Sequence, residues 1–333
     1  MRDARVSLAH GNGGRLMREL IEQVFAPELA GPLLDTGADA ATVPVSAGED
    51  LVVTTDGFTV KPLEFPGGDI GSLAVHGTVN DLAVSGAVPR YLTLGVIIEE
   101  GLEMATVRRI AGSLGRAARE CGVAVVAGDT KVVGRGECDG MYLTTTGIGF
   151  KPSGMRFALD RIRPGDRVLV SGPVGDHGAA VLLARQEFGF RGDLRSDAAS
   201  VFPEAQALIA VPGLRFMRDP TRGGLATVAH EIARAARFTV YLSEAEIPVN
   251  DAVQSVCELL GFDPLYLASE GRLVAVVAPE TADAALSALR RVAPRAALIG
   301  EIQGDAPAVV LATGFGGRRW LDELEDDPLP RIC

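Results

Sequence analysis

Apolar residues along this chain fall into short and long segments, which predict strands alternating with helices. Six short runs have the length of buried strands: 51–56, 91–98, 123–131, 141–150, 167–172 and 273–279. Five longer segments have helical length: 69–86, 103–121, 176–188, 223–236 and 280–292. The 69–86 segment carries small or apolar residues on nearly every side, so we expect a helix that is buried on most sides. The alternation predicts an α/β or α+β fold.

The length of the chain and a break in its pattern predict two domains. A chain of 333 residues is too long for one ordinary hydrophobic core. The sequence KPSG at 151–154 interrupts the pattern and marks the boundary. We therefore predict an N-terminal domain over 1–151 and a C-terminal α/β domain over 152–315. The last segment, 316–333, combines loose glycines, an acidic run and prolines, which predicts a mobile tail.

Composition and charge exclude several classes of protein. Hydrophobic residues make up 47% of the chain and charged residues 23%, so it can bury a large core. The formal net charge of −11 argues against a broad nucleic-acid surface, because phosphate backbones attract clusters of Lys and Arg. No apolar run has the length of a membrane span, and the N-terminus has no apolar secretory signal region. We expect a cytoplasmic protein that binds neither nucleic acid nor membrane.

The cysteines and histidines show no zinc-binding spacing. Cys121 and Cys257 lie in apolar helical segments, where we expect small buried hydrophobic residues. The histidines are expected to be structural: His10, His76, His177 and His230. Cys333 differs, because it is the last residue of the predicted tail. Such a thiol is either an incidental exposed group or a carrier that reacts as the thiolate.

Carboxylates in apolar surroundings are candidates for a metal site. Asp81 follows Asn80 in the middle of the apolar 69–86 helix, where a carboxylate is costly unless it is paired or binds a metal. Asp56 and Asp129 are each predicted to end an apolar strand and to enter a glycine-containing turn, and Asp39 is a further candidate. Several such carboxylates suit Mg²⁺, which prefers oxygen ligands. Aspartate also favours plain turns, so the alternative of ordinary loops and a salt bridge stays open.

Other polar residues suggest phosphate binding and proton transfer. The sequence has no Gly-x-x-x-x-Gly-Lys-Ser/Thr loop. Arg218 and Arg222 precede Gly223 at the start of a predicted helix, an arrangement that suits a phosphate but also occurs at ordinary joints. Lys131 follows Asp129 by two residues, so both side chains share one side of a strand. Glu270 lies in a predicted turn before a strand. Both Lys131 and Glu270 are also compatible with ordinary surface charges.

Taken together, these segments resemble the HypE family of hydrogenase maturation factors. The segments that carry the resemblance follow in order from His10 to Cys333: HGNGG, TTDGF, FPGGDIGSLAVHGTVNDLA, VVAGDTKVV, VSGPVGDHG, RDPTRGGLA, LASEG and PRIC. The glycine segments are shared with the wider aminoimidazole ribonucleotide synthetase-like ATP-binding superfamily. The resemblance implies a two-domain fold with N-terminal domains that pair into a dimeric β-barrel. A C-terminal α/β domain and a flexible tail complete the implied fold.

The resemblance also implies a reaction. A partner carbamoyltransferase places a carboxamide on the Cys333 thiol, and the enzyme uses ATP to dehydrate it to a thiocyanate. An iron-carrying scaffold complex then receives cyanide for the iron of nickel–iron hydrogenase. The remaining alternatives are a small-molecule kinase or synthetase of the same superfamily and a nucleotide-sensing scaffold.

The resemblance gives the candidate residues roles in this reaction. Mg²⁺ and ATP phosphates are assigned to carboxylates supported by Asn80, namely Asp39, Asp56, Asp81 and Asp129. Glu270 is the candidate base, and Lys131 stabilises developing phosphate charge or assists proton transfer. Arg218 and Arg222 are candidates for phosphate contacts from the second domain. Cys333 is then a tethered substrate.

Overall fold

The computed structural model describes residues 5–7, 10, 19–29, 46–185, 194–304, 306–324, 329 and 331–333. The chain divides into two compact units. Unit 1 comprises Met1–Leu82, Ala87–Gly154 and Cys333, and unit 2 comprises Ala83–Gly86 and Met155–Ile332. Within the residues that the structure describes, no helix is both long and apolar enough to cross a membrane.

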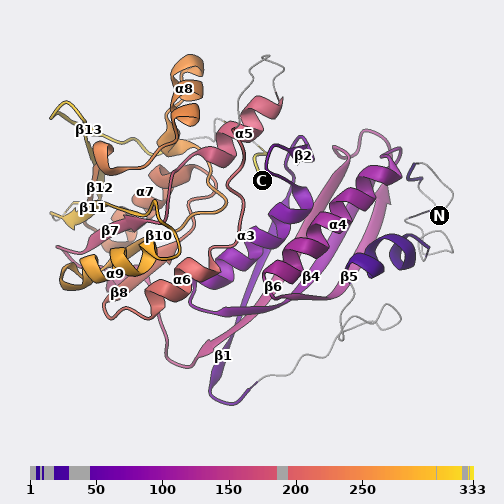
Figure 1. Cartoon of the computed structure of the whole chain (residues 1–333), viewed down its shortest axis with the longest axis horizontal. Coiled ribbons are helices and arrows are strands. Elements are labelled where there is room, and N and C mark those ends of the chain that lie inside the picture. The colour runs from indigo at the N-terminus through magenta and orange to yellow at the C-terminus, as the bar shows by residue number, and fades with distance from the viewer. Residues whose placement is uncertain are drawn as a thin grey trace. The chain divides into compact units, whose positions relative to one another are not determined.

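Unit 1 is built on a four-stranded sheet of order β1-β6-β4-β5. Its strands are β1 (Glu49–Phe58), β4 (Val88–Glu99), β5 (Ala124–Val133) and β6 (Met141–Pro152). β4 and β5 run parallel, whereas the other neighbours are antiparallel. Helices α3 (Ile70–Val84) and α4 (Met104–Glu120) lie along one face of this sheet (Figure 1). Short elements complete the unit: η2 (Ile21–Phe25), α2 (Ala26–Leu29), β2 (Glu64–Phe65) and β3 (Gly68–Asp69).

Side chains alternate between the two faces of this sheet along β1 and most of β4. The β4 residues that face the helices are buried: Leu92, Leu94, Val96 and Ile98. The opposite face carries exposed apolar side chains: Leu51, Val53 and Ile97. Because one face is covered and the other is open, the sheet has a period-two pattern on β1 and β4.

Helix α3 is buried on most sides, as its sequence predicts. Its start is capped by Asp69, whose Oδ1 accepts from the N–H groups of Gly71 and Ser72 at 2.8 and 3.0 Å. Asn80 and Leu82 have no exposed surface. This helix therefore carries its polar residues Asn80 and Asp81 into the centre of unit 1.

Unit 2 contains a seven-stranded sheet of order β13-β12-β9-β11-β7-β10-β8. Its strands are β7 (Arg167–Val170), β8 (Leu214–Arg218), β9 (Thr239–Ser243), β10 (Val274–Val277), β11 (Ala297–Gln303), β12 (Ala308–Ala312) and β13 (Arg318–Trp320). Its helices are α5 (Asp176–Arg185), α6 (Phe202–Ile209), α7 (Gly224–Ala236), α8 (Asp251–Leu260) and α9 (Ala282–Arg290). The 3-10 turns are η3 (Leu159–Arg161), η4 (Glu244–Glu246), η5 (Pro264–Tyr266) and η6 (Pro279–Thr281).

The sheet of unit 2 is covered on both faces. Val168 and Val170 of β7 pack in a core with α7, whereas Leu169 between them packs with α6 and α9. A strand buried on both faces reads as a continuous apolar run, which is why VAVV of β10 and RVLV of β7 were predictable as strands.

Two expectations from the sequence differ from the structure. Asp56 and Asp129 were placed in glycine-containing turns at strand ends, but both lie within strands, β1 and β5. Ladder hydrogen bonds to β6 and β4 override the turn preference of the Asp and Gly residues there. The 316–333 segment was expected to be mobile throughout. Instead, Arg318–Trp320 form β13 against β12, and Leu321 beside it is buried.

Candidate active site

Two of the predicted carboxylates meet on the helix-covered face of unit 1. Asp56 of β1 accepts a hydrogen bond from the hydroxyl of Thr78 on α3, with 2.9 Å between the oxygens. Asp81, one turn further along α3, accepts from the hydroxyl of Thr54 on β1 at 2.7 Å. Burial raises the pKa of Asp56, the negative charge of Asp81 raises it further, and the Thr78 hydrogen bond lowers it. The two carboxylates therefore interact and favour a nearby cation.

Asp129 lies on the opposite, open face of the same sheet. Asp56 pairs with Thr145 of β6, Thr145 pairs with Leu94 of β4, and both Thr145 and Leu94 are buried toward the helices. Asp129 instead pairs with Gly95, one residue further, and its side chain is 63% exposed. Three strand spacings also separate β1 from β5, roughly 14 Å. Within one chain, Asp129 is therefore remote from Asp56 and Asp81.

Lys131 accompanies Asp129, as the two-residue spacing predicts. The Nζ of Lys131 lies 2.8 Å from Oδ2 of Asp129, and both side chains are about equally exposed. The hydrogen bond from Lys131 lowers the pKa of Asp129, so this carboxylate is ionised at neutral pH. The pair presents adjacent opposite charges on the open face of the sheet.

Among the residues that the structure describes, the remaining metal-ligand candidates do not complete a cluster with Asp56 and Asp81. Asp39 lies outside the described residues. Asn80 is fully buried beside Asp81 on α3. Across the described part of the chain, no three His, Cys, Asp or Glu side chains gather as a metal-binding group. Among the described residues, Asp56 and Asp81 are therefore the candidate carboxylates that lie together within one chain.

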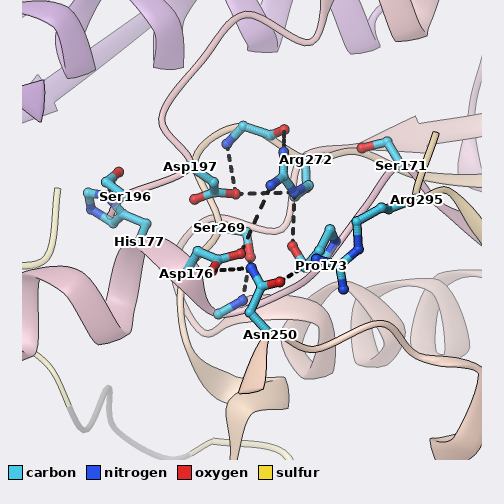
Figure 2. Close-up of polar contacts among 12 residues, drawn as sticks. Ser171, Pro173, Asp176, His177, Ser196, Asp197, Asn250, Ser269, Arg272 and Arg295 are labelled. Carbon is cyan, nitrogen blue, oxygen red and sulfur yellow. Dashed lines mark hydrogen bonds and ion pairs between the residues drawn. The ribbon is translucent and has the colours of Figure 1, made fainter. Parts of the chain in front are cut away.

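Glu270 lies in unit 2, in a loop fixed by a buried ion pair. Its side chain is almost fully buried. Its backbone N–H donates to Oδ1 of Asp197 at 3.1 Å. Asp197, whose side chain is 1% exposed, lies 3.5 Å from Nε of Arg272. Figure 2 shows Arg272 at the centre of these contacts, between Asp197 and Asp176. Asp197 therefore fixes the loop that carries Glu270 by a hydrogen bond, and Arg272 fixes Asp197 by an ion pair.

Arg272 also fixes the glycine-rich 171–178 segment. Its Nε donates to the carbonyl oxygen of Pro173 at 2.9 Å, and its guanidinium lies 3.9 Å from Asp176. The N–H of Gly175 donates to the hydroxyl of Ser269 at 2.8 Å (Figure 2). The N–H of Gly178 donates to the carbonyl oxygen of Ala268. These N–H groups are used inside unit 2, so they give this glycine-rich segment a structural role.

Arg218 is the last residue of β8, Arg222 lies two residues before the start of α7, and both are exposed. Arg218 lies 3.5 Å from Glu231 on that helix. Gly223 adopts φ 73, and a side chain at Gly224 would meet the carbonyl oxygens of Leu265 and Leu267 at 2.6 Å. The two glycines therefore allow the helix to begin close against the 264–267 turn.

Cys333 belongs to unit 1, where it contacts the segment directly after β1, the strand that carries Asp56. Its carbonyl oxygen accepts from the N–H of Thr59 at 3.0 Å and lies 3.3 Å from the Thr59 hydroxyl. Thr59 follows Phe58, the last residue of β1. The other thiols differ: Cys257 is buried as predicted, with its pKa raised to about 11 by burial, whereas Cys121 is only half-buried.

Comparison with known protein families finds an N-terminal and a C-terminal domain in the order that the sequence predicts. Residues 37–150 match the model of the AIR synthase related protein, N-terminal domain, and residues 163–311 match that of its C-terminal domain. The carbamoyl dehydratase HypE of Bradyrhizobium diazoefficiens is 48% identical over 338 residues, which cover 100% of this chain and 97% of that protein. The chain belongs to the HypE family of carbamoyl dehydratases.

Solved structures of HypE proteins share the fold of this chain. A hydrogenase maturation protein HypE in complex with ATP has a TM-score of 0.93 at 46% identity, covering 98% of this chain and 99% of that one. The HypE chain of a HypE–HypF complex has a TM-score of 0.80 at 42% identity, covering 92% and 99%. The two-domain α/β architecture is thus that of the HypE family.

Several polar residues that shape this HypE-family site were not found from the sequence. Thr54 and Thr78 orient the two carboxylates, Thr59 contacts Cys333, and Asp197 with Arg272 fixes the Glu270 loop. Threonine is common in strands and marks no chemistry by itself. Only the alternation in β1, where Thr54 and Asp56 share a face, pointed toward such a role.

Proposed function

We propose that this chain uses ATP and Mg²⁺ to convert a carboxamide on the Cys333 sulfur into a thiocyanate. Membership in the carbamoyl dehydratase family supports this reaction. The net change converts –S–CO–NH₂ and ATP into –S–C≡N, ADP and phosphate. The oxygen lost from the carboxamide leaves in the phosphate, and its two N–H hydrogens leave as protons. The product supplies cyanide ligands for the iron of nickel–iron hydrogenase.

The observation that carries this proposal is the contact of Cys333 with Thr59. Thr59 follows Asp56 by three positions on the same segment of unit 1, so this contact supports a role for Cys333 near that carboxylate. A C-terminal residue whose backbone is bound next to the strand that carries Asp56 suits a substrate that is tethered to its enzyme. Tethering turns a reaction between two molecules into one within a single molecule, which favours correct orientation.

The chemistry requires a phosphoryl transfer followed by proton loss. Hydroxide is a poor leaving group from the amide carbon, so the γ-phosphoryl group of ATP is transferred to the carboxamide oxygen. Phosphate then departs as the two N–H protons are removed. We assign Glu270 as the base that removes a proton from the carboxamide nitrogen. We assign Lys131 to stabilising the developing phosphate charge or to proton transfer. Arg218 and Arg222 are assigned to phosphate contacts.

The carboxylates suit a hard divalent cation. The negative charge of Asp81 raises the pKa of Asp56, and a bound cation would relieve this repulsion. Both offer oxygen ligands, with Asn80 and Asp39 as further candidates. Bound Mg²⁺ would neutralise the charge of the ATP phosphates.

A second copy of the chain accounts for Asp129 and Lys131. These two residues lie on the open face of the sheet, opposite Asp56 and Asp81. The same face exposes Leu51, Val53 and Ile97, and both β1 and β5 are edge strands. We propose a homodimer through this sheet, a dimeric β-barrel in which the edge strands pair, so that one copy's Asp129 and Lys131 on β5 lie beside the other copy's β1, which carries Asp56, and contribute to its site.

Two partners follow from the proposed reaction. A carbamoyltransferase must load Cys333, and an iron-carrying scaffold complex must take the cyano group. A structure of a HypE–HypF complex supports a HypF-type protein as the first partner. Because both partners must reach the sulfur, we propose that the last residues of the tail leave their docked position between steps.

The test follows the mass of the C-terminal peptide. Chain carbamoylated on Cys333 by its partner transferase is incubated with Mg·ATP, and the peptide is expected to lose the mass of one water as phosphate is released. C333S should show no phosphate release that depends on the transferase, because it lacks the thiol that is carbamoylated. The matched variant C121S should behave as wild type. An unchanged peptide mass with intact ATP binding contradicts the proposal. Steady ATP turnover in C333S would favour a kinase, and nucleotide binding without turnover would favour a sensing scaffold.

A further inference from the structure

The end of the chain is held on unit 2 by side chains of one helix, α5. The Nε2 of His177 lies 2.8 Å from the carbonyl oxygen of Ile332. Arg185, the last residue of α5, donates a hydrogen bond to the carbonyl oxygen of Arg331. The two carbonyl groups that precede Cys333 are therefore both bound by α5 side chains.

The hydrogen bonds of His177 determine its protonation. A carbonyl oxygen only accepts, so Nε2 must carry the proton that binds Ile332. Nδ1 is then the acceptor, and the Ser196 hydroxyl, 2.8 Å away, donates to it. The Ser196 oxygen in turn accepts from the N–H of Ala198 at 3.0 Å. Figure 2 shows Ser196 directly beside the His177 ring. The ring is thus held in one tautomer with its donor aimed at the tail.

Burial accompanies these hydrogen bonds. His177 has no exposed surface, and the side chains of Ile332 and Leu329 are 2% and 6% exposed. Arg331 between them adopts φ 59, in the left-handed region that non-glycine residues seldom occupy. A backbone held in this way is bound at a defined position of unit 2.

We propose that His177 is a positioning residue that, with Ser196 and Arg185, forms a latch for the C-terminal tail. This inference rests on the proposed function, in which Cys333 carries the substrate. The hydrogen bonds from His177 and Arg185 go to the backbone carbonyl groups of Ile332 and Arg331, not to the Cys333 side chain. The latch can therefore hold the tail whether the sulfur carries hydrogen, a carboxamide or a cyano group. Loading and transfer then require the tail to leave His177.

The ionisation of His177 limits how the latch opens. Burial, helped by the positive charge of Arg185, lowers its pKa to about 4, although the Ile332 hydrogen bond opposes this. The ring therefore stays neutral near pH 7, and its Nε2 donor is constant. A partner that competes for the tail, rather than a change of pH near neutrality, is the expected means of release.

The experiment measures access to the Cys333 sulfur by alkylation with iodoacetamide, followed in the C-terminal peptide by mass spectrometry. H177F keeps a ring but removes the donor, so the buried Ile332 carbonyl loses its partner and alkylation should accelerate on the order of tenfold. H177Q retains an N–H donor near the Nε2 position and should stay close to the wild-type rate. H230F is the matched control, because His230 Nε2 contacts the carbonyl oxygen of Leu321, also near the chain end, at 2.8 Å. It should leave the Cys333 rate unchanged.

The outcomes separate the latch from general loosening and from the proposed reaction. Equal rates for folded H177F and wild type overturn the latch, as does an equal acceleration in H230F. If H177F does not fold, S196A serves instead: it removes the hydroxyl that fixes the tautomer, and an unchanged rate in S196A overturns the proposal. In carbamoylated protein, H177F should also slow single-turnover dehydration without changing ATP affinity. Faster alkylation in H177F, with no dehydration even in wild type, keeps the latch and rejects the proposed function.

Discussion

The hydroxyl of Thr54 on β1 donates to Oδ2 of Asp81 on α3, with 2.7 Å between the two oxygens. On the same strand face, Asp56 accepts from Thr78 of α3. Strand and helix therefore exchange two hydrogen bonds in opposite senses, each from a threonine to an aspartate. Each carboxylate is oriented by the element that carries the other one. The pair is a set of carboxylate oxygens held in fixed orientations, and its geometry depends on how α3 packs on β1.

Replacing Thr54 with Val should weaken binding of Mg·ATP. The substitution preserves shape and removes one hydrogen bond to the charged Asp81, so the affinity should fall roughly tenfold. Stability should change little, because Thr54 is only half-buried. Calorimetric titration with ATP, with and without Mg²⁺, checks this.

T55V is the matched control for T54V. Thr55 lies on the open face, and its hydroxyl donates to the carbonyl oxygen of Thr145. An equal loss of Mg·ATP affinity in both variants would mean that Thr54 does not act through Asp81.

Heterodimers should reveal whether Lys131 acts across the proposed dimer. D81A and K131A chains are co-expressed with different affinity tags, and the mixed dimers are purified. If each site takes Asp81 from one copy and Lys131 from the other, one of the two sites is fully wild type. Mixed dimers should then retain about half of the wild-type dehydration rate, because only interactions made at one site are lost.

Each homodimeric variant serves as the control, and both should be inactive. Mixed dimers as inactive as their parents would place Asp81 and Lys131 of one chain in the same site. That result would contradict the trans arrangement.

Replacing Arg272 with Met should destabilise unit 2 in a way that depends on pH. Asp197 and Asp176 would remain buried without their cation, a loss of roughly 3 kcal/mol at pH 7. Burial already raises the pKa of both carboxyls. A folded state with raised carboxyl pKa values binds protons more readily than the unfolded state, so its stability increases as pH falls.

The destabilisation by R272M should therefore shrink between pH 7 and pH 5, as measured by urea unfolding of wild type and variant. R319M is the comparison, because Arg319 pairs with Asp263 at a more exposed site. A constant difference across this pH range would show that Arg272 acts through packing alone.

His177 should make the folded chain sensitive to mild acid. Its pKa is about 4 in the folded protein, below that of a solvated histidine. The neutral ring contributes stability that is fully present above the unfolded pKa and is lost as pH falls toward 4, by up to roughly 3 kcal/mol. H177Q should lack this loss, so wild type and variant should converge as pH falls from 6.5 to 4 in urea unfolding. Parallel curves would contradict a buried neutral imidazole.

Much of the fold could be predicted from residue patterns alone. The apolar, small-residue helix over 69–86 is α3, and the paired glycines after Arg222 begin α7. The two-residue spacing of Asp129 and Lys131 placed both on one side of a strand, where they form an ion pair. The segment near the C-terminus was harder, because β13 is short and exposed and forms only by pairing with β12. Its own three residues carry no period that marks a strand.

The sequence by itself determined which residues are candidates for the chemistry, whereas the tertiary structure decided which of them share a face. β5 contains a register shift against β4: Leu92 pairs with Val125, but Thr93 pairs with Ala127. The extra residue reverses the alternation, so Val125 faces the helices while Asp129 faces the open side. Without this bulge, Asp129 would point toward the same face as Asp56. A strand's register depends on its neighbour, and no property of the VVAGDTK segment alone fixes it.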